Sequence, residues 1–278
     1  MNMISWSIDE VVLLQKDGGN DRLKIIYQAF KEVYLEPPTI PYTDEDGWNY
    51  LMTPGRHKAL TKWKKDYPDM ELDDTKSTKD WLVHVLPAFD MHHWYGNGGE
   101  GTAMSSYIKA IEESGVFSEV EEGKKPHIHF QSQTSWTVVQ EFWDALCAKY
   151  DLEYFQMGIK EDFEFAFNTD TSYQYLPTRY VVVFHDEDGD MIGEKLTADV
   201  GELLDFLIHE DYFDSIDDLI PFMIKGTSSN LHRSEGFKRL IRKELTVEQL
   251  INAVNEKLMN DGADDDETHL EYIKLTKE

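Results

Sequence analysis

The stretch HIHFQSQTSWTVVQEFWDALCAKYDLEYFQMGIKEDFEFAFN, residues 127–168, decides the fold. It opens with a short run in which two histidines alternate with Ile128 and Phe130, as side chains on opposite faces of a strand do. A helix-like segment with a broad apolar stripe follows, and two aromatic-rich extended runs, residues 152–158 and 163–167, are predicted to be strands that close the stretch. This order predicts a β-α-β-β unit, which would form the core of an α+β fold with an antiparallel sheet.

The residues before this unit are predicted to extend it. Residues 4–14 alternate as a strand does, and residues 21–34 have the apolar spacing of one helix face. Residues 102–114 also show helical spacing and stop at Gly115, which predicts another helix. The polar and acidic residues 66–80 are predicted to form a linker.

After the central unit, RYVVVF (179–184) is a clear strand, and the turn that follows it predicts a hairpin with Asp188 and Gly189 at its tip. From residue 197 the pattern becomes mainly helical. Two pairs have capping-box spacing, namely Asp199 with Glu202 and Thr246 with Gln249, and HLEYIKL at 269–275 is predicted to return as a strand.

These patterns divide the chain into three regions. We expect an N-terminal strand–helix region (1–65), an α+β core (81–196) and an acidic, mainly helical C-terminal region (197–278). One continuous domain is the alternative.

Charge is the strongest global signal. The chain has 54 acidic and 27 basic residues and a formal net charge of −27. A field of this sign repels nucleic-acid phosphates and anionic membranes and attracts basic protein surfaces. We therefore expect a basic protein as partner, with no direct contact to nucleic acid or membrane. The alternative is that the negative charge only keeps the protein soluble. No export signal and no apolar run long enough to span a bilayer is present, which predicts a cytoplasmic location.

The central unit resembles the Api92-like or YubB-like group of ferredoxin-like domains, which occurs in phage and plasmid proteins. That group combines a strand, a Ser/Thr-x-Trp corner, a helix with Phe and Leu, a Tyr-rich strand and an acidic-aromatic strand. The matching residues are Phe130, Ser132, Ser135, Trp136, Phe142, Leu146, Tyr150, Leu152, Phe163, Ala166 and Phe167. Thr137 and Val138 stand where the group has two prolines. The resemblance implies a ferredoxin-like fold for the α+β core (81–196) and an origin in a mobile element, and it implies no reaction.

Residues 185–218 form the first candidate site, because they hold thirteen acids and one base, Lys195. Apolar residues such as Leu203 and Phe206 interleave with the acids, so the carboxylates should be held on a folded scaffold. Carboxylates fixed in this way can imitate a row of phosphates and occupy the basic groove of a nucleic-acid-binding protein; a solvated helix face is the alternative. The predicted partner-binding residues are Asp186, Asp188, Asp190, Glu194, Asp199, Glu202, Asp205, Glu210, Asp211, Asp214, Asp217 and Asp218.

Histidines form the second candidate site. His92 and His93 precede a glycine-rich loop, and His127 and His129 share one strand face. Together they would suit zinc or another divalent metal, although polar surface histidines give the same pattern. A small metal-dependent enzyme or ligand-binding protein that uses loop 84–102 is therefore one alternative function.

The sequence favours a non-enzymatic protein over an enzyme. It contains no G-x-S-x-G or H-E-x-x-H motif, and Cys147 lies in a helix-like segment where a buried, inert thiol is expected. Our leading hypothesis is a phage- or plasmid-encoded acidic protein that binds and inhibits a basic host protein, such as a nucleic-acid-binding or defence factor. A self-assembling structural protein, with a second copy of the chain as partner, is a further alternative.

Overall fold

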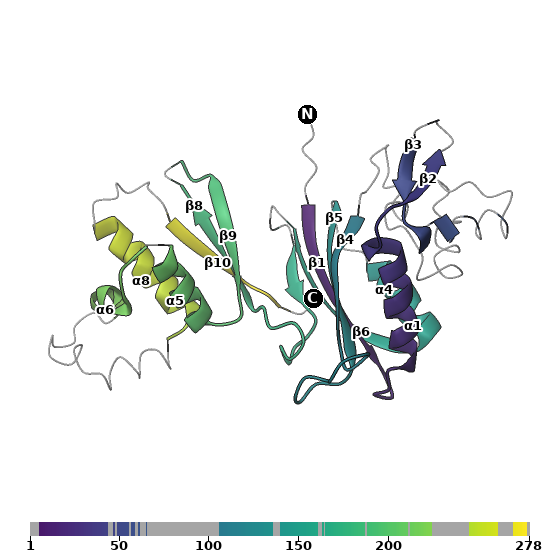
Figure 1. Cartoon of the computed structure of the whole chain (residues 1–278). Coiled ribbons are helices and arrows are strands. Elements are labelled where there is room, and N and C mark those ends of the chain that lie inside the picture. Colours follow the sequence, from purple (N-terminus) through teal and green to yellow (C-terminus); the bar gives the residue numbers. More distant parts are fainter. Residues whose placement is uncertain are drawn as a thin grey trace. The chain divides into compact units, whose positions relative to one another are not determined.

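The chain folds into two compact units, Met1–Leu176 and Pro177–Lys277 (Figure 1). The computed structural model describes residues 6–43, 47, 49–55, 57–58, 61, 65, 106–135, 140–160, 163, 165–186, 188–210, 212–223, 245–260 and 269–276. Each unit contains an antiparallel sheet and helices, so the predicted α+β class is confirmed. Within these residues, no helix combines the length and the apolar character needed to cross a membrane.

Five described strands form the main sheet of the first unit. Their order across the sheet is β4 (Ser106–Ser114), β5 (His127–Ser135), β1 (Trp6–Gln15), β6 (Leu152–Lys160) and β7 (Ala166–Asn168). All neighbouring strands are antiparallel. Because β1 lies between β5 and β6, the passages β1–α1–β4 and β5–α4–β6 interleave in one sheet.

Two helices of the first unit pack on one face of this sheet (Figure 1). They are α1 (Asp21–Phe30), which continues as the π-helical turn η1 (Lys31–Leu35), and α4 (Gln140–Tyr150). A small hairpin of β2 (Ile40–Thr43) and β3 (Asn49–Met52) follows η1.

Three fully buried aromatic rings join the helices to the sheet. Phe130 of β5 lies 4.8 Å from Phe30 of α1 and 5.1 Å from Trp143 of α4, measured between ring centroids. Edge and tilted ring contacts of this kind add to the free energy of burial. Because side chains alternate along a strand, His127 and His129 lie on the opposite face of β5.

The predicted helix over residues 102–114 is wrong for its described part, which is strand β4. The register against β5 shifts between Ile108 and Ala110, so β4 carries one extra residue there. Positions 108 and 111 therefore fall opposite Ser132 and Phe130, which lie on the same face of β5. The bulge gives a strand the three-residue spacing that is typical of a helix.

The strand predicted over residues 163–167 is also displaced. β7 begins only at Ala166, and Phe163 has a φ of 54°, a left-handed conformation that a strand does not contain. The backbone N–H of Phe163 donates to the carbonyl of Lys160, which closes a turn after β6.

The second unit is built on a sheet of three described strands. Their order is β10 (His269–Lys274), β8 (Tyr180–His185) and β9 (Met191–Thr197). The described helices are α5 (Val200–His209), α6 (Ile216–Met223) and α8 (Val247–Asn260). The prediction of a mainly helical C-terminal region is therefore wrong, because its last strand pairs with the β8–β9 hairpin to form the sheet against which the helices pack.

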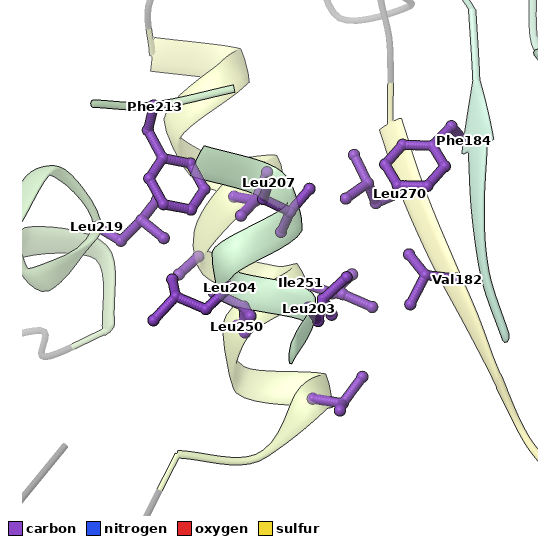
Figure 2. Packing of buried hydrophobic residues seen from close by; sticks show 13 residues of the cluster. Val182, Phe184, Leu203, Leu204, Leu207, Phe213, Leu219, Leu250, Ile251 and Leu270 are labelled. Atoms are coloured by element: carbon purple, nitrogen blue, oxygen red, sulfur yellow. The ribbon is translucent and has the colours of Figure 1, made fainter. Parts of the chain in front are cut away.

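Alternating residues of the sheet and the inner faces of the helices build the core of the second unit. Figure 2 shows Val182, Phe184 and Leu270 of the sheet facing Leu203 and Leu207 of α5, and all five are buried. The sheet face that carries these residues is the one that the helices cover.

Both predicted capping boxes start helices of this unit. Oδ1 of Asp199 accepts from the backbone N–H groups of Gly201 and Glu202 at 2.8 and 3.0 Å. At the start of α8, the Thr246 N–H donates to Oε1 of Gln249 at 3.0 Å, and the Gln249 N–H donates to Oγ1 of Thr246 at 3.2 Å. These bonds satisfy N–H groups that have no partner within the helix.

Candidate partner-binding surface

A glycine in the β8–β9 hairpin opens a space on the helix-covered side of the second sheet. Gly193 of β9 lies directly opposite Phe184 of β8 in the register. A Cβ built on Gly193 would meet no atom within 4 Å. A larger residue there would therefore extend into open space beside the Phe184 ring.

This space is the mouth of a pocket between β9 and α5, which we call the β9–α5 pocket. Its volume is about 180 Å³. Rings form much of its wall, since the Phe184 centroid lies 5.8 Å from that of Phe206 and 5.5 Å from that of Tyr212. The complete set of lining residues is Phe184, Ile192, Gly193, Glu194, Phe206, Glu210 and Tyr212.

The electrostatics of the β9–α5 pocket favour a cation. Glu210 lines it from the end of α5. Glu194 also lines it, but it pairs with Val183 in the register, so its side chain lies toward the other face of the sheet. None of the lining residues is Lys, Arg or His. Burial, together with the charge of Glu210, raises the pKa of the Tyr212 phenol, so that this group stays neutral and can donate a hydrogen bond. Aromatic faces attract cations within roughly 6 Å of the ring centroid.

The nearest base along β9 is already engaged. Nζ of Lys195 lies 5.2 Å from the centroid of the Phe206 ring and 3.4 Å from Oε1 of Glu202. The Phe206 ring therefore already takes part in one cation–π contact, with a lysine of the chain itself.

The structure places the twelve predicted acids in different roles. Two of them, Glu194 and Glu210, line the β9–α5 pocket. Four accept hydrogen bonds from backbone N–H groups, at the hairpin turn or at a helix start: Asp186, Asp199, Glu202 and Asp218. Five have exposed side chains: Asp188, Asp190, Asp205, Asp214 and Asp217. Asp211 lies outside the described residues.

The two described histidines of the predicted metal site have separate partners. Nδ1 of His127 lies 3.0 Å from the carbonyl oxygen of Lys125, and burial lowers the pKa of this histidine. Nε2 of His129 lies 2.9 Å from Oε2 of Glu10 on the neighbouring strand. His92 and His93, with the whole of loop 84–102, lie outside the described residues.

Cys147 is buried in α4, as the pattern around it indicates. Burial raises the pKa of its thiol to about 12, so the thiol is protonated at neutral pH. A protonated, enclosed thiol is a poor nucleophile.

Sequence reasoning missed the residues that shape the β9–α5 pocket. In the sequence, Phe206 and Tyr212 have the pattern of structural residues between the acids, and Gly193 has that of an ordinary hairpin residue. Their convergence depends on the β8–β9 register and on the packing of α5, neither of which a local pattern records. Comparison of the chain with protein-family models, with curated proteins and with solved structures finds no match.

Proposed function

We propose that this chain is an acidic interaction protein that binds a basic protein and seats one Lys or Arg side chain of that partner in the β9–α5 pocket. The observation that carries the proposal is the lining of this pocket, which has three aromatic rings and the acid Glu210 and no Lys, Arg or His. A cation that enters gains ring contacts together with charge–charge attraction.

The size of the pocket supports a side chain as the occupant. Its volume of about 180 Å³ lies below the roughly 300–1,000 Å³ that is typical of pockets for small molecules and cofactors. The exposed acids Asp188 and Asp190 lie at the tip of the same hairpin, where they add to the attraction of a basic surface.

The biological setting of the proposal is a phage- or plasmid-encoded inhibitor of a basic host protein, whose nucleic-acid-binding groove the acidic surface would occupy. Two observations support this setting, the net charge of −27 and the resemblance of the central unit to ferredoxin-like domains of mobile elements. The strand order β4–β5–β1–β6, with two interleaved strand–helix–strand passages, supports the ferredoxin-like assignment of the first unit.

The test uses a fluorescently labelled deca-arginine peptide and fluorescence anisotropy at 150 mM salt, chosen to screen contacts beyond about 8 Å. Gly193→Val fills the pocket mouth with a residue that strands favour, and Gly193 has no positive φ that a valine would strain. We expect this change to weaken binding by about tenfold or more, which corresponds to roughly 1.4 kcal/mol.

Two charge changes serve as a matched pair. Glu210→Gln removes one charge from the pocket, and Asp214→Asn removes one exposed charge that is not part of its lining. We expect a severalfold loss for the first and less than about a twofold loss for the second, because isolated surface charges contribute little. Equal losses for the two variants, or unchanged binding by Gly193→Val, would show that the pocket is not the site.

A further inference from the structure

The other face of the second sheet brings two histidines together. His185 ends β8 and His269 begins β10, and the register places them directly opposite each other. Their rings stack with a centroid distance of 4.6 Å and an interplanar angle of 8°. Glu271, two residues beyond His269, lies on the same face of β10.

The ligand atoms of these three residues lie close together, and because the two ring planes are nearly parallel, one ring has to rotate before both Nε2 lone pairs point at one ion. Nε2 of His185 lies 3.8 Å from Oε2 of Glu271, and Nε2 of His269 lies 3.8 Å from Oε1 of the same carboxylate. The three groups offer one ligand atom each within 4.8 Å of one another. A separation of 3.8 Å is too long for a hydrogen bond, and it is close to the roughly 3.3 Å that separates ligands on a tetrahedral metal with bonds of about 2.0–2.1 Å.

The hairpin turn orients one of the rings. Nδ1 of His185 lies 3.2 Å from the carbonyl oxygen of Gly189, so this nitrogen carries the proton and donates it. The lone pair is then on Nε2, which is buried and has no hydrogen-bond partner in the described part of the chain. Metal-binding histidines are held in this way, with the second ring nitrogen donating to a carbonyl or carboxylate.

The geometry points to a binding site for a divalent transition ion of the zinc class, formed by His185, His269 and Glu271. Two imidazoles and one carboxylate are a ligand set that Zn²⁺ favours, and three protein ligands leave a fourth position for water or another ligand. The side chains of His269 and Glu271 are 42% and 65% exposed, so an ion can reach the site from solvent. This inference does not depend on the proposed function, because the two sites lie on opposite faces of the sheet.

A metal at this position would also tie β10 to β8. Binding to the folded state alone raises the free energy of unfolding by RT ln(1 + [metal]/Kd). Zinc would therefore stabilise the second unit, in which β10 pairs with β8.

The test titrates the full chain with ZnCl₂ by calorimetry and compares His269→Gln and Glu271→Gln with His129→Gln. Both site positions are exposed enough to tolerate glutamine, and circular dichroism checks the fold of each variant. Since other histidines in the chain can also take zinc, the readout is the difference between variants. We expect each of the two site variants to bind one equivalent of zinc fewer, or to lose more zinc affinity than the about 10–100-fold that loss of an outer-shell partner costs.

Cobalt gives an independent readout of the same site. Co²⁺ should add visible absorption bands of four- or five-coordinate geometry to the parent chain and to His129→Gln, with weaker bands in His269→Gln and Glu271→Gln. If zinc stoichiometry, zinc affinity and the cobalt spectrum are the same in the site variants as in the parent chain, the proposal is wrong.

Discussion

His129 of the first unit and His185 of the second occupy similar positions, each on the sheet face that the described helices of its unit do not cover. Their partners differ. Nε2 of His129 lies 2.9 Å from Glu10, which is a one-to-one hydrogen bond. Nε2 of His185 shares a carboxylate, 3.8 Å away, with a second histidine. A histidine on a sheet face therefore indicates a ligand site only where further ligand atoms lie close to it.

The two units also differ in a way that makes them separately measurable. All seven tryptophans lie before residue 177, so tryptophan emission reports on the first unit alone. Far-UV circular dichroism reports on both. The two signals together therefore separate a loss of the first unit from a loss of the second.

The largest effect is expected from Phe130→Ala, which tests whether the helix-covered face is the core of the first unit. The change removes a ring that is 0% exposed and contacts Phe30 and Trp143. We expect a loss of about 3–5 kcal/mol in the free energy of unfolding, measured by urea titration of tryptophan emission.

Ile25→Ala is the control for Phe130→Ala, since Ile25 of α1 is 58% exposed. Its effect should stay within about 0.5 kcal/mol, as is usual for surface changes. Comparable losses for the two variants would mean that the face carrying Phe130 is not the core.

Asp170→Asn should have the next largest effect on the free energy of unfolding, because the buried carboxylate of Asp170 accepts four hydrogen bonds within the first unit. Its carboxylate accepts from the N–H and Oγ of Ser172 and from the N–H groups of Tyr175 and Leu176, at 2.5 to 3.1 Å. An amide of the same shape presents N–H₂ to one pair of these donors. We expect a loss of about 3 kcal/mol, since each buried donor without an acceptor costs about 1–3 kcal/mol. An unchanged urea midpoint of the tryptophan signal would contradict this account.

The same carboxylate predicts how the first unit responds to acid. Burial alone would raise the pKa of Asp170, but the four hydrogen bonds that it accepts lower the pKa below 3.8 overall. The unfolded chain therefore binds the proton more readily, and stability falls as the pH drops from about 5 through the folded pKa. The fall, followed by tryptophan emission, should be shallower in Asp170→Asn. Equal slopes in the two proteins would exclude Asp170 as a source.

Local patterns predict the parts of this fold that local physics determines. The run Val181–Phe184 is a strand because every residue in it is buried and prefers extended backbone, and the capping boxes depend on residues only three apart. The bulge in β4 is different, because its cause is the pairing with β5. Two further pairs depend on strand register in the same way: Gly193 lies opposite Phe184, and His269 lies opposite His185. Neither pair could be predicted from the sequence.

The smallest predicted effect concerns the second unit and the start of α8. Thr246→Ala removes the hydroxyl that accepts from the Gln249 N–H, while Thr246→Ser keeps it. We expect the alanine variant to lose about 1 kcal/mol and the serine variant to match the parent within about 0.3 kcal/mol, as for other helix caps. The loss should appear in the thermal transition followed by circular dichroism. A loss of the same size in both variants would assign the effect to the methyl group rather than to the cap, and the start of α8 would then depend on packing of the kind that holds α1 and α4 in the first unit.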